Sequence, residues 1–304
     1  MSILLNEIER IRIKMGLTEK QMVELIENPK FQGKLETIVE EYSKPLIQSQ
    51  ENFSIPMQNV QLIRPLEGGL YKGPEPIEKQ VLTLAEIFKL NPEPTLKYTR
   101  EVLPTLSLPQ NKVEGWFAIL SVDALAKRYF RTITDPNLKY WNAIKCSLSY
   151  FQELIPKFEN YRKEISPEHL KRSDRTNWAL KIISEIQNGL EINVIPAQTG
   201  FLYQKSTGRE FRKSLVNKKD EFGLGVLEVL LIILANPLIS ERKLNIDCSG
   251  DQFSPAVIWT WELYQLAFEF FDGIKLRAHD SDDDNGDSNE YGSASGFLPT
   301  GVEL

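Results

Sequence analysis

Cysteine and histidine are both scarce in this sequence. Among 304 residues there are two cysteines, Cys146 and Cys248, and two histidines, His169 and His279. The two cysteines do not have the spacing of a metal site, and a chain of this length needs no disulfide to stabilise its core. A metal site built on several histidines is therefore not expected, and no GxSxG nucleophile motif occurs. We predict two reduced thiols and a cytoplasmic location.

Apolar runs long enough to cross a membrane are also missing. The stretch at residues 224–235 is apolar except for Gly225 and Glu228, and Pro237 follows it. A membrane-spanning helix needs roughly 20 apolar residues, and this run is far shorter. The N-terminus carries a charge by residue 7, which argues against a signal peptide. We therefore predict a buried core helix at 224–235 and no membrane partner.

Positive charge is in deficit overall, with a net charge of −6, but it is concentrated in one segment. Residues 203–219 contain only one acidic side chain, Glu210. Gly200, Thr207 and Gly208 are typical of a loop. We predict an anion-binding loop whose ligands are Arg209, Arg212, Lys213 and Tyr203. The expected partner is a nucleic acid or an anionic protein surface. The alternative is a solvated basic loop that pairs with an acidic segment of the same chain.

Periodicity and turn residues indicate an α+β fold with three regions. Residues 1–50 are predicted to be helical, residues 51–110 to be a proline- and glycine-punctuated connection with helices, and residues 111–304 to form an α+β domain. In this domain a small antiparallel sheet is expected to pack on the 224–235 helix. The helices at 3–44 allow a third function, a helix-turn-helix regulator, although Glu36, Glu40 and Glu41 are unfavourable in a DNA-reading helix.

Local patterns place the individual elements of the C-terminal part. Strands are predicted at 113–120, at 190–195 ending at Pro196, and at 243–247, with helices at 123–130, 138–158 and 167–187. Residues 267–279 are predicted to form a hairpin around the two-residue turn Asp272-Gly273. Such a turn pairs Phe271 with Ile274 and gives a buried face that contains both side chains.

Acidic side chains near the C-terminus suggest a second kind of site. Paired carboxylates with a histidine can hold a metal ion for phosphodiester hydrolysis, and the candidate catalytic residues are Asp247, Asp251, Asp272 and His279. The alternative is that these residues end strands and form turns.

The acidic segment at 280–290 contains six carboxylates and no cation. Its spacing does not fit an EF-hand, because a sixth-position Gly286 would put Ser281 first and Gly292 twelfth. A looser cation site would use Asp280, Asp282 and Asp284, and the alternative is a solvated acidic loop. No cofactor is predicted, while Mg²⁺ or Ca²⁺ at this segment stays open.

Several short phrases between residues 113 and 299 resemble those of an uncharacterised, conserved bacterial protein family of unknown function. They are VEGWFAIL (113–120), VIPAQTG (194–200), DEFGLG (220–225), IDCSGDQFSP (246–255), FFDG (270–273) and YGSASGFLP (291–299). The resemblance implies an intracellular bacterial protein. It assigns no functional residue, and residues 1–110 lie outside it.

Two main functions therefore remain. The sequence favours a non-enzymatic interaction protein that uses residues 203–219, and the alternative is a metal-dependent hydrolase or nuclease that uses the C-terminal carboxylates.

Overall fold

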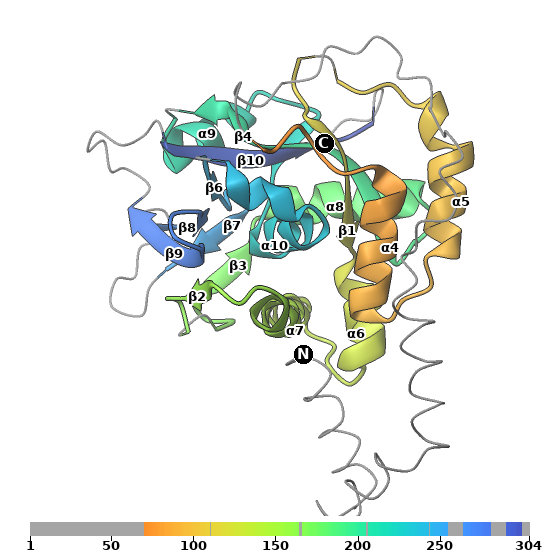
Figure 1. The fold of residues 1–304 in the computed structure, drawn as a ribbon, viewed down its shortest axis with the longest axis horizontal. Coiled ribbons are helices and arrows are strands. Elements are labelled where there is room, and N and C mark those ends of the chain that lie inside the picture. The colour runs from red at the N-terminus through yellow and green to blue at the C-terminus, as the bar shows by residue number, and fades with distance from the viewer. Residues whose placement is uncertain are drawn as a thin grey trace, which may run out of the picture. The chain divides into compact units, whose positions relative to one another are not determined.

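The computed structural model describes residues 70–109, 111–163, 166–204, 206–242, 244–254, 264–280 and 290–299. Helices and a large mixed sheet make up this part of the chain, which confirms the α+β class (Figure 1). The helices predicted at 3–50 and the first part of the predicted 51–110 connection, residues 51–69, lie outside the described residues. The three-region division stays a prediction.

Short polar side chains begin several of the helices. The hydroxyl of Ser121 accepts a hydrogen bond from the amide of Ala124 at 3.0 Å, and the carboxylate of Asp135 accepts one from Leu138 at 2.7 Å. Such caps satisfy amides that the first helical turn leaves unpaired. The described helices are α4 (Ile77–Phe88), α5 (Glu93–Glu101), α6 (Val122–Tyr129), α7 (Pro136–Leu154), α8 (Asp174–Ile186), α9 (Gly208–Leu215) and α10 (Val226–Ala235), with 3₁₀ turns η1 (Leu103–Thr105) and η2 (Pro237–Glu241).

The sheet is larger than predicted and is not purely antiparallel. In the described residues it has ten strands, and its main path runs β1-β4-β10-β6-β8-β7-β3. Off this path β9 pairs with β8, β2 with β9, and β5 with β10. Two pairs, β10 with β6 and β2 with β9, are parallel. The strands are β1 (Gly115–Leu120), β2 (Phe158–Asn160), β3 (Leu170–Arg172), β4 (Ile192–Gln204), β5 (Glu221–Gly223), β6 (Asn245–Asp247), β7 (Asp251–Phe253), β8 (Tyr264–Glu269), β9 (Ile274–Asp280) and β10 (Tyr291–Phe297).

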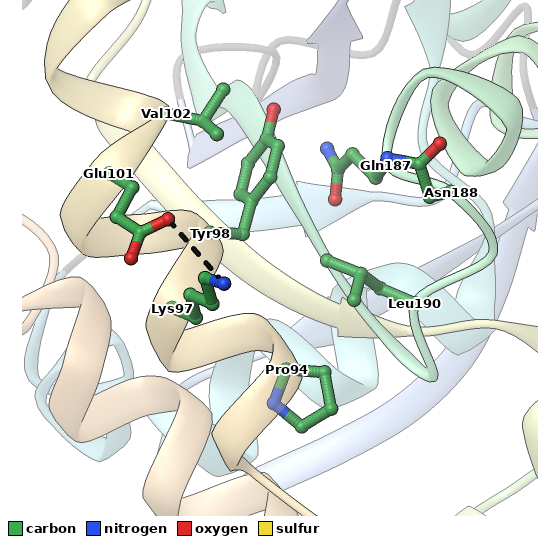
Figure 2. Close-up of a pocket in the computed structure, with 8 residues that line it drawn as sticks. All are labelled: Pro94, Lys97, Tyr98, Glu101, Val102, Gln187, Asn188 and Leu190. Carbon is green, nitrogen blue, oxygen red and sulfur yellow. Dashed lines mark ion pairs between the residues drawn. The ribbon is translucent and has the colours of Figure 1, made fainter.

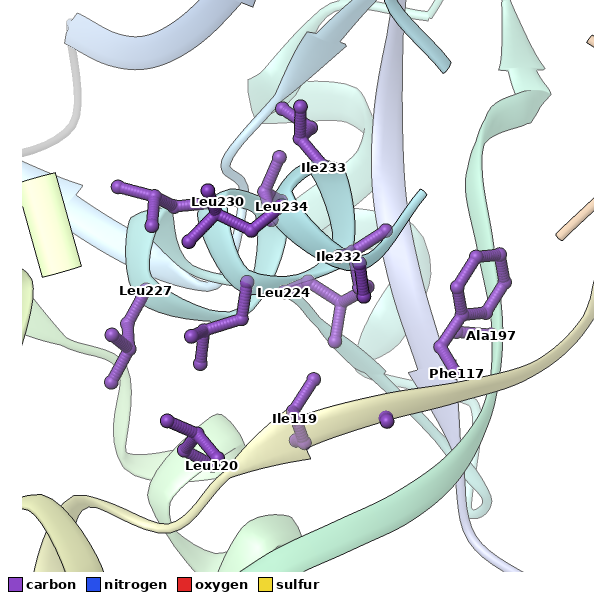
Figure 3. Close-up of a cluster of buried hydrophobic side chains, with 14 of the residues drawn as sticks. Phe117, Ile119, Leu120, Ala197, Leu224, Leu227, Leu230, Ile232, Ile233 and Leu234 are labelled. Carbon is purple, nitrogen blue, oxygen red and sulfur yellow. The ribbon is translucent and has the colours of Figure 1, made fainter. Parts of the chain in front are cut away.

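Helix α10 is buried on all sides, as the apolar run predicted. Every residue from Val226 to Ala235 is buried, and the helix contacts β1, α4 and α7. Figure 3 shows Ile119 and Leu120 of β1 beside the helix, within a cluster that includes Leu227 and Ile232. None of the helices in the described ranges is long and apolar enough to cross a membrane. Burial of these side chains is the main stabilising contribution to the core.

Strand β4 continues through Pro196, so the prediction that the strand ends there was wrong. The amide of Glu114 donates to the carbonyl of Ala197 at 2.9 Å, which shows that the polar groups of Ala197 point toward β1. Alternation then directs the ring nitrogen of Pro196 away from β1. On that side the ladder with β10 ends at the Gly296–Ala197 pair. The missing N–H therefore costs no ladder hydrogen bond.

Two glutamine side chains close the free edges of the β1–β4 ladder at the Ala118–Val194 pair. Gln80 of α4 accepts from the amide of Ala118 at 3.0 Å and donates to the carbonyl of Trp116 at 3.0 Å. On the opposite edge Gln187 accepts from the amide of Val194 at 2.9 Å and donates to its carbonyl at 2.6 Å. Each amide therefore satisfies backbone groups that a neighbouring strand would otherwise bond at this position.

The predicted hairpin exists as β8 and β9, but its predicted register was wrong by one residue. Glu269 pairs with Lys275 and Phe268 with Leu276, and residues 270–273 connect the two strands in place of a two-residue turn. The register shift moves Phe268 to the buried face and Glu269 to the other, while Ile274 and Leu276 of β9 keep the buried face predicted for them. Phe271, which we expected to be buried, is 81% exposed in the connection.

Candidate functional site

The basic segment at 203–219 contains a helix, α9, at Gly208–Leu215, so the prediction of a loop was wrong for that part of it. The hydroxyl of Thr207 accepts from the amide of Glu210 at 3.2 Å, and the Glu210 carboxylate accepts from the amide of Thr207 at 3.0 Å. This reciprocal capping box starts α9. The Thr-x-x-Glu spacing was visible in the sequence and is the signal that would have identified the helix.

Helix α9 buries one side and exposes cations on the other. Phe211 and Leu215 are buried, whereas Arg209 and Lys213, four residues apart, are exposed. Side chains at this spacing lie on the same side of a helix. We call Arg209 and Lys213 the α9 basic face. The third predicted ligand, Arg212, points elsewhere, because its guanidinium donates to the side-chain oxygen of Gln265 on β8 at 2.8 Å.

Tyr203, the fourth predicted ligand, holds α9 in place. Its hydroxyl donates to the two carboxylate oxygens of Glu221 at 2.7 and 2.8 Å, and its ring meets Phe211 edge-on with centroids 4.6 Å apart. Burial and the neighbouring Glu221 carboxylate raise the pKa of Tyr203 above its usual range. Lys218 pairs with the same carboxylate at 2.9 Å. Tyr203 and Lys218 are therefore bound to Glu221 near the end of the segment, while Arg209 and Lys213 are exposed on α9.

A polar network lies on the sheet beneath α9. Gln265 donates to the hydroxyl of Ser249 at 2.9 Å, and Ser249 donates to Ser293 at 2.7 Å. Further along β10, Gln198 donates to Ser295 at 2.9 Å. Ser293 and Ser295 alternate with small residues that face the apolar side of the sheet. Buried polar groups are costly unless they are hydrogen-bonded, so the network favours this one arrangement of the strands. Arg212 connects the network to α9.

Gly208 allows the close contact between α9 and this network. A β-carbon at Gly208 would lie 1.7 Å from the side-chain oxygen of Gln265. Any other residue at the start of α9 would displace Gln265, and with it the acceptor of Arg212.

The four predicted catalytic residues occupy different environments. Asp251 is buried at the start of α10, where its carboxylate accepts from the amide of Val226 at 2.7 Å. Asp247 is buried at the end of β6, whereas Asp272 is exposed in the hairpin connection, 3.7 Å from Lys157. His279 lies in β9 and is described only at its backbone.

No metal site is evident in the described ranges. They contain no group of three His, Cys, Asp or Glu side chains that could hold a metal ion. Of the predicted cation ligands, Asp280 ends β9 and is described only at its backbone, and Asp282 and Asp284 lie outside the described residues.

Asp251 belongs to a buried charge cluster that sequence reasoning missed. The hydroxyl of Tyr140 donates to both Asp251 oxygens at 2.8 and 2.9 Å. The Arg172 guanidinium lies 4.0 Å from the Tyr140 ring centroid and pairs with Glu228 at 2.5 Å. Glu228 also accepts from the amide of Gly225 at 3.0 Å. The lone carboxylate in an otherwise apolar helix was the available signal, since a buried charge needs a partner.

The cluster contains two carboxyl groups and one guanidinium, and this raises the proton affinity of one carboxyl. Burial, followed by the nearby Glu228 carboxylate, raises the pKa of Asp251 to about 7, against the opposing effects of Val226, Tyr140 and Arg172. The pKa of the same carboxyl in an unfolded chain is about 3.9. The contribution of protonated Asp251 to stability is therefore complete below about pH 4 and is lost as the pH rises through 7.

This linkage predicts a pH-dependent stability that Asp251→Asn removes. When the pH rises from 5 to 8, the natural sequence should lose about 2.5 kcal/mol of unfolding free energy through Asp251. Asp251→Asn should not show this loss. Urea unfolding at the two pH values measures the difference. Asp174→Asn, a substitution of an exposed carboxylate on α8, is the control and should give a constant difference. An identical pH dependence for the natural sequence and Asp251→Asn would contradict the prediction.

A shallow pocket lies elsewhere, between α5 and the turn that joins α8 to β4 (Figure 2). Its volume is about 160 Å³, and Tyr98, Leu190 and Val102 supply much of its apolar wall. An ion pair between Lys97 and Glu101, 3.9 Å apart, lies at this pocket. None of the residues predicted from the sequence to form a site lines it.

Comparison of the chain with protein-family models, curated proteins and solved structures gives no match. The resemblance to a bacterial family rests on the sequence phrases alone. The function of the chain must therefore be inferred from the geometry of α9, the polar network and the buried charge cluster.

Proposed function

We propose that the protein binds an anionic macromolecule through the α9 basic face. The observation that carries this proposal is that Arg209 and Lys213 are exposed on the same side of a helix, four residues apart. Arg212 and Lys218 contact Gln265 and Glu221 and fix the position of that helix. Cations on a rigid element hold their geometry without a large ordering cost when a partner binds.

The contacts that hold α9 in place also support the proposal. Its capping box, its buried Phe211 and its contact with the polar network fix the helix at its start, middle and inner side. A basic loop that was only solvated would not need such anchoring. A partner is favoured whose phosphates or carboxylates can bind two neighbouring cations.

The alternative, metal-dependent hydrolysis, has less support. Asp251 is bonded to the start of α10 and to Tyr140, and Asp272 is exposed beside Lys157. A hydrolase would need these carboxylates to converge on one substrate-accessible ion. The hypothesis of a helix-turn-helix regulator depends on residues 3–44, which lie outside the described residues, and it stays a prediction.

The double variant Arg209→Ala/Lys213→Ala tests the proposal. We expect it to weaken binding to the preferred polyanion about tenfold, because it removes two contacts of roughly 0.7 kcal/mol each. Fluorescence anisotropy with labelled single-stranded RNA, single-stranded DNA, duplex DNA and poly-glutamate measures the affinities.

The matched control is Lys127→Ala/Lys181→Ala, which removes the same charge from exposed positions on α6 and α8. Equal losses in the two double variants would assign the effect to net charge and contradict a role for α9. Absence of binding by the natural sequence to all four probes at low salt would also refute the proposal.

A further inference from the structure

A row of aromatic and basic side chains runs along β9 toward the hairpin connection. Phe271 is 81% exposed, and the Lys275 ammonium lies 5.9 Å from its ring centroid. Tyr161 is 50% exposed, and the Arg277 guanidinium lies 4.6 Å from its ring centroid. We call Phe271, Lys275, Arg277 and Tyr161 the β9 strip.

The fold places the two rings at opposite ends of this strip. Strand β2 pairs in parallel with β9, and the amide of Tyr161 donates to the carbonyl of Leu276 at 3.1 Å, which holds Tyr161 beside Arg277. Phe271 lies in the connection before β9, beside Asp272 and its contact with Lys157. The two cations alternate with buried Ile274 and Leu276, so they point to the face of the sheet opposite the core.

Strand register puts the strip on the same face of the sheet as the attachment of α9. On β8 the residues that share a face are Gln265, Ala267 and Glu269, and the last two pair with Arg277 and Lys275. Gln265, in the same row, accepts the Arg212 guanidinium from α9. The β9 strip therefore continues from α9 along one face of β8 and β9.

The electrostatics of the strip differ from those of the α9 basic face. Arg277 pairs with Glu269 at 3.2 Å, which partly neutralises it, and Asp272 lies beside Lys157 at 3.7 Å. The strip is thus a weak phosphate site by itself, and its distinctive groups are the two exposed rings. Exposed aromatic rings beside cations are suited to stacking by planar groups of an anionic chain.

We propose that the anionic partner is a single-stranded nucleic acid whose bases stack on Tyr161 and Phe271 while its phosphates contact the α9 basic face. The proposal rests on the proposed function, because it assigns the partner of the same surface. A single strand offers phosphates and accessible base faces together. A duplex stacks its bases internally, and an acidic polypeptide of glutamates has no rings to offer.

The experiment uses the full chain and fluorescein-labelled 20-nucleotide oligouridylate, with an RNA duplex of equal length and poly-glutamate as competitors. Phe271→Ala and Tyr161→Ala should each weaken oligouridylate binding about tenfold, as loss of one stacked base does. Phe271→Trp should retain binding, because it keeps a ring at the hairpin connection. Thermal unfolding confirms that each variant is folded.

Trp178→Ala is the matched control, because Trp178 is 53% exposed and has the Lys181 ammonium 5.3 Å from its ring centroid on α8. It should leave oligouridylate binding unchanged. Equal losses for Trp178→Ala and Phe271→Ala would overturn the proposal, as would competition by the duplex or poly-glutamate at least as strong as competition by unlabelled oligouridylate.

The outcomes also separate this inference from the proposed function. If Arg209→Ala/Lys213→Ala weakens binding and the two aromatic variants do not, the partner is anionic without stacked bases, and the inference fails alone. If none of these variants alters binding, both fail.

Discussion

Arg172→Met is expected to lower the free energy of unfolding by about 3–5 kcal/mol. Arg172 and Glu228 are buried, and the guanidinium Nη2 lies 2.5 Å from the Glu228 Oε1. Asp251 is close enough for the Glu228 carboxylate to raise its pKa. Removal of the guanidinium leaves two buried carboxyl groups without a cation, and methionine restores only its volume. Urea unfolding at pH 7 measures the loss, which should be larger at pH 8 than at pH 5.

A second substitution shows whether the loss comes from the unpaired charge. Glu228→Gln keeps the length of the side chain and an oxygen that can accept from the amide of Gly225. The double variant Arg172→Met/Glu228→Gln should therefore recover at least half of the stability lost in the single variant.

The control is Arg100→Met, which breaks an exposed pair with Glu78 at 3.0 Å and should destabilise the fold far less than Arg172→Met, because solvent screens exposed ion pairs. A loss for Arg172→Met no larger than that for Arg100→Met would show that the buried cluster is energetically unimportant.

Gly250→Ala is expected to destabilise the fold by about 3 kcal/mol. A β-carbon at Gly250 would lie 2.5 Å from the carbonyl oxygen of Gly223 and 2.6 Å from the amide nitrogen of Gly225. These are backbone atoms, so relief requires a shift of the chain that leads into α10. The shift would also move Asp251, the next residue, away from the amide of Val226.

Gly189→Ala separates this steric effect from the conformational preference of glycine. Gly189 has a φ of +70°, and a β-carbon added there would meet no atom within 4 Å. Its substitution should cost about 1 kcal/mol, from backbone conformation alone. Chemical denaturation compares the two variants, and a Gly250→Ala loss equal to that of Gly189→Ala would contradict the close backbone contact.

The core helix and several strands were predictable because their signals are local. Residues 224–235 are apolar on every side and too short for a bilayer, which identified α10, and β-branched and aromatic residues identified β1. By contrast, α9 was missed because Gly200, Thr207 and Gly208 were given more weight than the Thr207–Glu210 capping box. The hairpin register was missed because an Asp-Gly pair marks a turn without fixing the number of residues in the connection.

The candidate site was predictable only in part. Local concentration of charge identified Arg209 and Lys213, but nothing local shows that Arg212 bonds to Gln265, more than fifty positions away in the sequence. The same holds for Tyr140 and Asp251, and for Arg172 and Glu228, which meet only through strand order and the position of α10. Long-range pairs of this kind depend on the tertiary fold and not on propensity.

The salt dependence of single-strand binding tests the central claim most directly. The dissociation constant for labelled oligouridylate, measured by anisotropy across a KCl series, should rise with salt because each phosphate contact releases counterions. If Arg209 and Lys213 each contact a phosphate, Arg209→Ala/Lys213→Ala should reduce the slope of log affinity against log salt by about 1.4. Lys127→Ala/Lys181→Ala should leave the slope unchanged. Equal slopes for the natural sequence and the α9 variant would contradict the assignment of α9 as the anion-binding element.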